Sequence, residues 1–356
     1  MTLKKLQTPS FTRPAVHAAF LAAFLAAAFV APGPTGAADL TGDAALDIKE
    51  WTVPYDASRP RDPFAVDGAV WFVGQRTGYV ARLDLADGAF TKIDLPNGER
   101  PHNLIVGTDG IVWYAGNSTG VIGRFDPTTQ AIEEIAMPDA AASDPHTLVF
   151  DATEENIWFS VQGGNMMGRM NVASRKVDLI AAQSEGARPY GIKVAPDGAV
   201  WVALFGVDKL GRIDPQTLEL TEIDLPRADA RPRRLEVGAD GRVWYVDYAG
   251  GFLGAYDPAT QGFKEWPMPA GADARPYGTA MDADGDVWFV ETGVQPNMFR
   301  GFDPDTETFF AGAPVPSGGG TLRHMHYHAP TGAVWFGADA NTIGRASVDA
   351  VPSPSQ

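Results

Sequence analysis

Apolar and polar residues alternate in short runs along most of this chain, and tryptophan recurs at a nearly constant interval within the pattern. Seven tryptophans follow a small or apolar residue, at spacings of 42 to 47 residues: Trp71, Trp113, Trp158, Trp201, Trp244, Trp288 and Trp335. Alternation with a period of two is typical of β-strands with one buried face. A strand-rich repeat of this length predicts an all-β fold, a β-propeller with one blade per repeat and therefore seven blades.

Each repeat contains four strand-like segments separated by turn-forming residues. In the repeat around Trp201 these segments are 188–194, 200–204, 209–214 and 220–226. Asp197-Gly198, between the first two, favours a tight hairpin because glycine tolerates positive φ. We therefore expect four-stranded antiparallel blades, with the tryptophan of each second strand packed between blades.

The two ends of the repeat array complement each other. The last repeat, from Arg323 to about Ala346, lacks an obvious fourth strand, whereas the segment 46–54 resembles an isolated fourth strand. The N-terminal strand is therefore predicted to complete blade seven and close the ring, which removes the open edges of a linear array.

The N-terminus has the features of a secretory signal peptide. Basic residues precede an apolar stretch, 15–31, and small residues follow it. We expect a signal peptide over residues 1–38, one propeller domain over 39–350, a disordered tail over 351–356, and a periplasmic or secreted protein. The alternative is an uncleaved membrane anchor, for which the apolar stretch is a little short.

Composition narrows the range of partners. The chain carries a formal net charge of −16, which argues against nucleic acid and anionic membranes as partners. It contains no cysteine, so disulfides, thiol catalysis and thiolate metal ligands are excluded. We expect a monomer that binds a small molecule or cyclic peptide at the central channel, and the acidity would tolerate a cationic ligand or metal.

Polar side chains recur at one position of the repeat, where the innermost strand begins. In six repeats this position directly follows a proline, and around the ring it is occupied by Arg61, His102, His146, Tyr190, Arg233, Tyr277 and His324. A packing position would be apolar in most blades. The pattern therefore favours a ligand site at the channel mouth, to which Arg275, just before its proline, also contributes. The alternative is that these side chains only connect neighbouring blades through hydrogen bonds.

Carboxylates and histidines add candidate chemistry. Asp247, Glu291 and Asp339 follow their tryptophans by three or four residues and are expected near the same face. Alternation would place His324, His326 and His328 on one face of the last inner strand, an arrangement suited to a metal. His326 and His328 also match apolar blade-packing positions of other repeats, so both interpretations stay open.

The repeat resembles the virginiamycin B lyase (streptogramin lyase) family over essentially the whole chain after the leader. The motifs that carry the resemblance are Arg-Pro-(His/Tyr), Asp-Gly-x-Val-Trp-Phe and Ile-Gly-Arg, as in 189–192, 210–212 and 342–345. The resemblance implies a seven-bladed propeller that uses Mg²⁺ to open the ester of a cyclic depsipeptide antibiotic by elimination.

The family's active residues are kept only in part. The family has two channel histidines, a glutamate two residues before the second, and a glutamate after the last Trp-Phe. The corresponding positions here hold Tyr277, His324, Leu322 and Asp339. A phenol, with an ordinary pKa of about 10, is not expected to replace a neutral imidazole at neutral pH.

The candidate site follows from these matches. His324 and Tyr277 are the candidate catalytic residues, and Asp339 and Glu291 are the candidate ligands of a divalent metal, Mg²⁺. The candidate substrate-binding residues are His102, His146, Tyr190, Arg233 and Arg275. Two alternatives to a lyase are a non-catalytic binding propeller and a gluconolactonase-like hydrolase, whose metal would be held by Glu291, Asn341 and Asp339.

Overall fold

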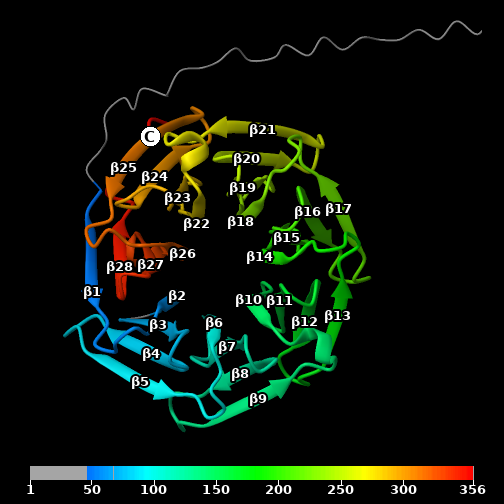
Figure 1. Ribbon diagram of the computed structural model, residues 1–356, viewed down its shortest axis with the longest axis vertical. Helices are drawn as coiled ribbons and strands as arrows, with labels where there is room; N and C mark the ends of the chain where they lie inside the picture. Colours follow the sequence, from blue (N-terminus) through cyan, green and yellow to red (C-terminus); the bar gives the residue numbers. More distant parts are fainter. Residues whose placement is uncertain (1–45, 67, 356) are drawn as a thin grey trace, which may run out of the picture. The chain divides into compact units, whose positions relative to one another are not determined.

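Seven four-stranded antiparallel sheets are arranged in a ring around a channel in the computed structural model, which describes residues 46–66 and 68–355 (Figure 1). Blades one to three are built from β2 (Pro60–Val66), β3 (Ala69–Gly74), β4 (Tyr79–Asp84), β5 (Phe90–Asp94); β6 (Pro101–Val106), β7 (Val112–Gly116), β8 (Val121–Phe125), β9 (Ile132–Ala136); and β10 (Pro145–Phe150), β11 (Asn156–Val161), β12 (Met166–Asn171), β13 (Val177–Ala181). The predicted seven-bladed propeller is confirmed.

The remaining blades repeat this order from the channel outward. Blades four to six comprise β14 (Pro189–Val194), β15 (Val200–Leu204), β16 (Lys209–Ile213), β17 (Leu220–Asp224); β18 (Pro232–Val237), β19 (Val243–Asp247), β20 (Phe252–Asp257), β21 (Gly262–Pro267); and β22 (Pro276–Met281), β23 (Val287–Glu291), β24 (Met298–Asp303), β25 (Thr308–Pro314). Three short 3₁₀ turns lie in loops: η1 (Ala140–Ala142), η2 (Gly271–Asp273) and η3 (Ala329–Thr331).

Blade seven joins the two ends of the described chain. It contains β26 (Leu322–His328), β27 (Ala333–Ala338), β28 (Thr342–Ser347) and, as its outer strand, β1 (Ile48–Thr52). In β1, Trp51 pairs with Ile343 and stacks on Trp335, with ring centroids 5.6 Å apart. The predicted closure by the N-terminal strand is therefore confirmed.

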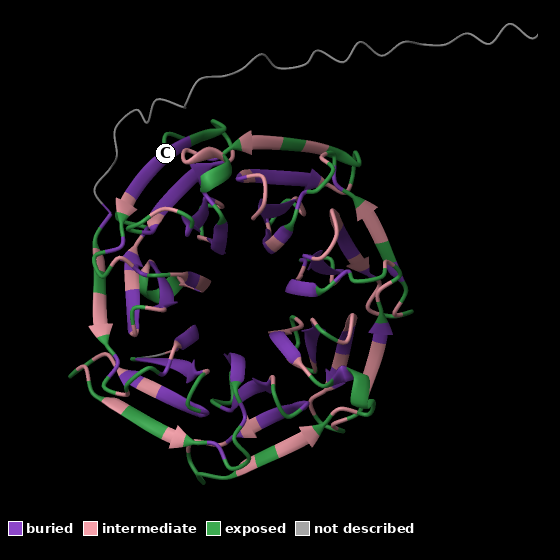
Figure 2. Ribbon diagram, viewed as in Figure 1, coloured by how far each residue is buried: buried purple, intermediate pink, exposed green. Residues whose placement is uncertain are grey.

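The apolar core lies between adjacent blades. Trp71 of blade one, for example, packs with Leu104 and Tyr114 of blade two. Figure 2 shows the same distribution, with buried inner strands and more exposed outer strands. The Gly of the third-strand motif has a packing reason: a Cβ at Gly123 would overlap the ring of Tyr114, the aromatic residue next to the blade's tryptophan. The motif thus allows an aromatic ring to lie flat across its own sheet.

The sequence predicted a signal peptide at the N-terminus and a disordered tail at the C-terminus. The predicted signal peptide, residues 1–38, lies outside the described residues and stays a prediction. Residues 351–355, expected from sequence to be disordered, lie against the propeller: Val351 joins a core cluster, and the backbone amide of Ser355 donates to Asp303. No helix within the described part of the chain is long and apolar enough to cross a membrane.

Candidate active site in the propeller channel

The innermost strands place consecutive polar residues at the channel because each contains a register shift. In β6, Pro101 pairs with Gly116 and Leu104 with Tyr114, so three steps on one strand oppose two on the other. This β-bulge breaks the alternation of strand faces. The same shift occurs in all seven inner strands. Two adjacent positions of each inner strand can therefore both contribute to the channel.

Blade seven differs by one residue from the register expected from sequence. Leu322 pairs with Ala338, three residues after its tryptophan, as Pro276 pairs with Glu291 in blade six. Arg323, rather than His324, therefore occupies the position equivalent to Tyr277. The seven equivalent residues, here called the channel ring, are Arg61, His102, His146, Tyr190, Arg233, Tyr277 and Arg323. Without a proline to mark the start of the strand, the sequence alignment of blade seven slipped by one position.

Aromatic members of the channel ring form a continuous arc. The ring centroids of His102 and His146 are 3.4 Å apart, and those of His146 and Tyr190 are 4.2 Å apart. The hydroxyl of Tyr190 is hydrogen-bonded to that of Tyr277. All four residues are buried. The structure thus brings together four residues that the sequence predicted at the channel, and all four are shielded from solvent.

Arginines surround the Tyr277 end of this arc. The Arg233 guanidinium lies 3.5 Å from the centroid of the Tyr277 ring. Burial raises the pKa of Tyr277, but the positive charges of Arg233, Arg61 and two further arginines outweigh it and lower that pKa to about 7. Burial and the neighbouring Tyr277 raise the pKa of Tyr190, which therefore stays a hydrogen-bond donor. These charges make the phenol of Tyr277 more acidic than the ordinary phenol that the sequence suggested.

The histidines of the channel are neutral. Burial, followed by the charges of nearby arginines, lowers the pKa of His102, of His146 and of His324 well below the usual value. The positive charge of Arg234 contributes to the lowering of all three pKa values. The imidazoles therefore contribute no positive charge, and the cationic groups on the channel axis are guanidinium groups.

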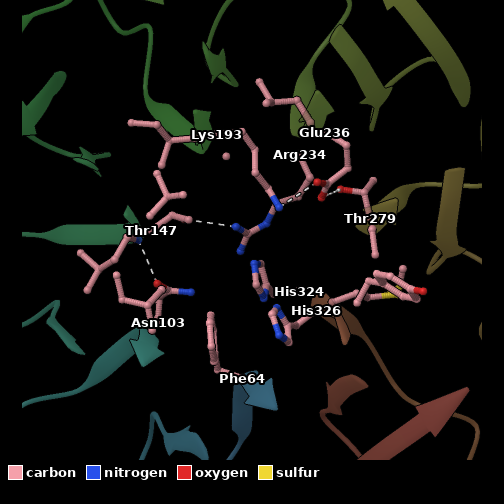
Figure 3. Close-up of a pocket in the computed structure, with 18 of the residues that line it drawn as sticks. Phe64, Asn103, Thr147, Lys193, Arg234, Glu236, Thr279, His324 and His326 are labelled. Carbon is pink, nitrogen blue, oxygen red and sulfur yellow. Dashed lines mark hydrogen bonds and ion pairs between the residues drawn. The ribbon is translucent and has the colours of Figure 1, made fainter. Parts of the chain in front are cut away.

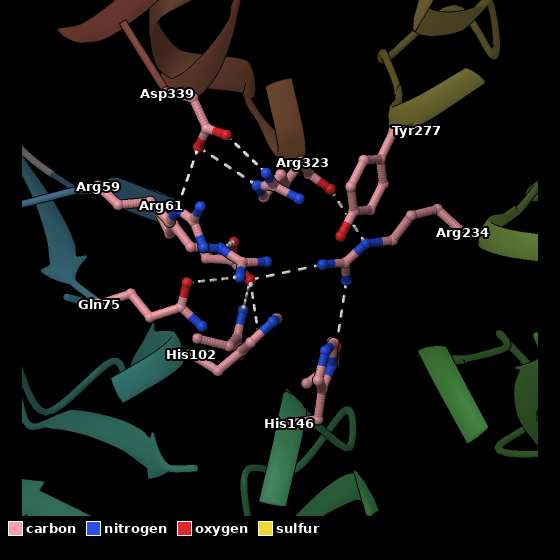
Figure 4. A network of polar contacts seen from close by, with 12 residues as sticks. Arg59, Arg61, Gln75, His102, His146, Arg234, Tyr277, Arg323 and Asp339 are labelled. Carbon is pink, nitrogen blue, oxygen red and sulfur yellow. Dashed lines mark hydrogen bonds and ion pairs between the residues drawn. The ribbon is translucent and has the colours of Figure 1, made fainter. Parts of the chain in front are cut away.

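Asp339 lies at the channel face but is paired with arginines. Its carboxylate accepts hydrogen bonds from Arg323, at 2.5 and 3.3 Å, and lies 3.5 Å from Arg59 (Figure 4). Glu291 is fully buried, accepts from the Ala270 amide at 2.8 Å, and forms an ion pair with Arg300 at 2.9 Å. Both candidate metal ligands therefore already have cationic partners.

The arrangement does not fit a divalent cation. Within residues 46–66 and 68–355, no group of three or more His, Asp or Glu side chains is arranged to hold a metal ion. Mg²⁺ requires several oxygen ligands, whereas the channel ring contributes guanidinium groups. Asn341, a ligand in the hydrolase alternative, instead donates to the carbonyl oxygens of Val53 and Tyr55 beside the N-terminal strand.

A second polar layer, one position further along the inner strands, was missed by the sequence analysis. Arg234 crosses the channel, donating from Nη1 to Thr147 at 3.2 Å and from Nε to the carbonyl oxygen of Arg323 at 3.3 Å. Its Nη2 lies 3.5 Å from the carboxylate of Asp62, which also accepts from Asn103 at 3.0 Å. The available signal was the run of polar residues directly after the ring positions.

His324 belongs to this second layer and faces a cavity of about 260 Å³ beyond it. This lower cavity lies on the C-terminal side along the inner strands, where Phe64, Arg234 and His326 also line it (Figure 3). His326 stacks on Phe64, with centroids 4.2 Å apart. His328 does not line this cavity, and its Nδ1 pairs with the Thr331 hydroxyl.

The outer surface around the channel ring is rich in arginine and aromatic residues. Arg233 lies 4.7 Å from the Phe205 ring and 4.4 Å from the Tyr248 ring. Arg275 and Arg231 are exposed beside these rings, 5.6 Å from Tyr248 and 4.9 Å from Phe205, respectively. The predicted contribution of Arg275 is therefore at the rim rather than within the buried ring.

The fold and the site together define the class of protein: a seven-bladed β-propeller with a polar, strongly cationic site in its central channel. Residues 177–353 match the model of the virginiamycin B lyase family, and the resemblance deduced from the repeat is confirmed. The comparison with curated proteins gives no match.

Solved structures share the fold. Virginiamycin B lyase from Staphylococcus aureus superposes with a TM-score of 0.76 at 22% identity, covering 85% of this chain and 99% of that chain. A streptogramin B lyase structure gives 0.76 at 23%, covering 85% and 97%. Hydrazine synthase from Kuenenia stuttgartiensis gives 0.67 at 15%, covering 82% and 96%. At these identities the likeness establishes the propeller fold alone.

Proposed function

We propose that this protein is a lyase that opens an ester in a cyclic peptide or lactone-type substrate, with the Tyr277 phenolate as the general base. The observation that carries the proposal is a buried phenol with a pKa of about 7 among four arginines. A base whose pKa lies near the operating pH combines a useful ionised fraction with adequate basicity. The family match over residues 177–353 supports the same class of reaction.

The chemistry needs no external reactant. Tyr277 oxygen takes the proton from the carbon next to a carbonyl group of the substrate. The C–H electron pair forms a carbon–carbon double bond, and the ester C–O bond breaks at the neighbouring carbon, releasing a carboxylate. The guanidinium groups of Arg61, Arg233 and Arg323 stabilise the negative charge that develops on the carbonyl and carboxylate oxygens. Arginine charge takes the electrostatic role that Mg²⁺ has in the family.

Tyr190 acts as a positioning residue in this scheme. Its raised pKa keeps its hydroxyl protonated, so it donates a hydrogen bond to the Tyr277 phenolate. A hydrogen bond to the charged form stabilises that form and orients the oxygen. Removing the Tyr190 hydroxyl should therefore raise the pKa of Tyr277 while leaving the base itself in place.

One observation favours a second function, a non-catalytic binding propeller. Tyr277 is only 1% exposed and Tyr190 only 3%, so a substrate reaches the phenolate only if the ring opens. In this alternative the exposed arginines and aromatic rings at the rim bind an anionic ligand, and the buried ring connects the blades. The two functions differ in whether a bound ester is converted to product.

Quinupristin is a suitable first substrate because a structure of catalytically inactive virginiamycin B lyase was solved with it. Elimination gives a linear product of unchanged mass, whereas hydrolysis adds one water, so mass spectrometry separates the two reactions. We expect an unchanged mass, a rate that rises with pH through about 7, no turnover in Tyr277→Phe, and a profile moved to higher pH in Tyr190→Phe.

Several outcomes would refute the assignment. Turnover that persists in Tyr277→Phe excludes this residue as the base, and a product heavier by one water makes the protein a hydrolase. Absence of product from quinupristin and from simple β-acyloxy esters, together with saturable binding of anions, supports the binding propeller instead.

We also propose that the protein is exported and acts as a monomer outside the cytoplasm. The leader over residues 1–38 supports export, and the net charge of −16 suits a soluble protein that does not bind anionic membranes. Mass spectrometry of the exported protein tests the cleavage near residue 38, and light scattering tests the oligomeric state. An intact N-terminus in the membrane fraction would contradict the proposal.

A further inference from the structure

The lower cavity is separated from the Tyr277 arc by the second polar layer. All seven blades contribute to its wall, and its volume is about 260 Å³. Its two sides differ chemically. Arg234 and Thr147 stand at the end nearest the second layer, whereas Phe64, Leu235 and Met281 belong to the apolar part of the wall. A cavity of this kind suits a small molecule with one polar and one apolar end.

Arg234 has hydrogen-bonding capacity that the protein does not use. Its side chain is 3% exposed, and a guanidinium group carries five N–H donors. Within the described chain, Nε and Nη1 each make one hydrogen bond, and buried Nη2 makes none, although it lies 3.5 Å from the Asp62 carboxylate. Nδ1 of His324, which also lines the cavity, is buried without a partner in the same residues. Unsatisfied donors of a buried cation favour an oxyanion as the missing partner.

The charges that line the cavity leave a net positive charge. Lys193 and Glu236 form an ion pair at 2.8 Å. Behind the wall, the carboxylate of Asp62 lies 3.5 Å from Arg234 and 3.5 Å from Arg61, so one carboxylate faces two guanidinium groups. The imidazoles add no charge, because burial lowers the pKa of His326 to about 3 and that of His324 well below its usual value. A monoanion would balance the wall.

We propose that the lower cavity binds a small carboxylate with a flat apolar body, its carboxylate against Arg234 and its body against Phe64 and His326. The stacked pair of Phe64 and His326 offers an aromatic surface at the cavity wall. This site is distinct from the Tyr277 arc and does not depend on lyase activity. The size of the cavity points to a monocyclic acid rather than to a peptide.

The first test compares ligands of the same shape on the intact wild-type protein. Calorimetric titration with benzoate and phenylacetate is compared with titration of the neutral amides benzamide and phenylacetamide. We expect the acids to bind at least about tenfold more tightly than the amides, because only the acids pair with the guanidinium group. Equal affinity for acid and amide would overturn the carboxylate assignment, and absence of binding by all four would overturn the site.

The second test locates the ligand by changing the charge of the wall. Lys193→Met leaves Glu236 unpaired and should weaken benzoate binding about tenfold, whereas Glu236→Gln should strengthen it several-fold. The matched control is Lys176→Met, which removes a lysine paired with Asp178 on an outer strand and should leave the affinity unchanged. If Lys193→Met and Glu236→Gln bind benzoate as wild type does, the ligand is not in this cavity.

The third test uses two adjacent arginines of β18. Arg234→Gln should abolish benzoate binding, whereas Arg233→Gln, which lies outside the cavity wall, should retain it. The charge series at residues 193 and 236 decides the question if Arg234→Gln fails to fold. Retained binding in a folded Arg234→Gln variant would refute the proposed contact. Absence of lyase activity in wild-type protein that binds benzoate would contradict only the proposed function.

Discussion

The low pKa of Tyr277 can be tested by removing the arginine closest to its ring. Among the charges that lower this pKa, that of Arg233 has the largest effect, and its guanidinium group lies 3.5 Å from the ring centroid. Arg233→Met keeps much of the length and apolar surface of the side chain but removes the charge. The variant should therefore leave the blade packed and raise the pKa of Tyr277.

The magnitude follows from the difference between the ordinary pKa of a phenol and the pKa of Tyr277 in its arginine-rich surroundings. A change from about 10 to about 7 corresponds to about 4 kcal/mol of preferential stabilisation of the phenolate. Four arginines contribute, so the loss of one should cost roughly 1 to 2 kcal/mol of this stabilisation and move the titration midpoint up by about one pH unit.

The midpoint is measured from the ultraviolet absorbance of the phenolate, with Tyr277→Phe identifying the signal. Stability gives a second measurement. A pKa that is lower in the folded than in the unfolded protein contributes stability that is present above about pH 10 and is lost as the pH falls through about 7. The free energy of unfolding should therefore rise between pH 7 and 9 in wild type, and less steeply in Arg233→Met. A wild-type midpoint near 10, or an unchanged midpoint in the variant, would refute the reasoning.

Three further predictions concern charge and packing. Asp339→Asn frees Arg323 from its carboxylate partner and should lower the titration midpoint of Tyr277, the opposite of the effect of Arg233→Met. The substitution should cost about 1 kcal/mol of stability, because the ion pair is partly exposed. A Mg²⁺-induced rise in wild-type Tm that this variant abolishes would instead establish Asp339 as a metal ligand. Deleting residues 46–54 removes the outer strand of blade seven and the buried side chains of Leu46 and Val53. Chemical denaturation should therefore show that the free energy of unfolding falls by about 5 kcal/mol, or the protein should aggregate. Melting like that of the parent protein would contradict the closure of the ring by this strand. Gly123→Ala should destabilise the protein by about 1 to 3 kcal/mol, because the added methyl overlaps the ring of Tyr114, and Gly110→Ala, where a Cβ meets nothing but φ is positive, separates this overlap from backbone strain.

The sequence predicted the architecture well because one packing requirement recurs in every blade. A tryptophan on each second strand fills the space between neighbouring sheets, and its spacing therefore reports the blade number. The pairing of Trp51 with Ile343 was predictable for a related reason, since a ring with one blade short of a strand needs the other chain end to supply it. The number of blades and the place of the N-terminal strand therefore depend only on the local sequence pattern and on the need to close the ring.

The site was predictable only where a proline marks the register. Six ring positions follow a proline, but blade seven has Leu322 there, and the ring member is Arg323. The second layer escaped detection because the β-bulge places Arg233 and Arg234, adjacent in sequence, at neighbouring levels of the channel. The pKa of Tyr277 depends on four arginines from blades one, five and seven, so no segment of sequence contains the information.

The charge distribution connects these observations. The chain has a net charge of −16, yet Arg61, Arg233, Arg234 and Arg323 converge on the channel axis. Among the described residues, the carboxylates of Asp62, Asp339 and Glu236 oppose them, and Glu236 is paired with Lys193. This local excess of positive charge stabilises a phenolate in the ring and favours an oxyanion in the cavity below it. The neutral histidines of the channel neither add to this positive charge nor reduce it. In the proposed lyase, the surrounding guanidinium groups would therefore let the Tyr277 oxygen act as a base at neutral pH, at the position where the resemblance to the family implies an imidazole nitrogen.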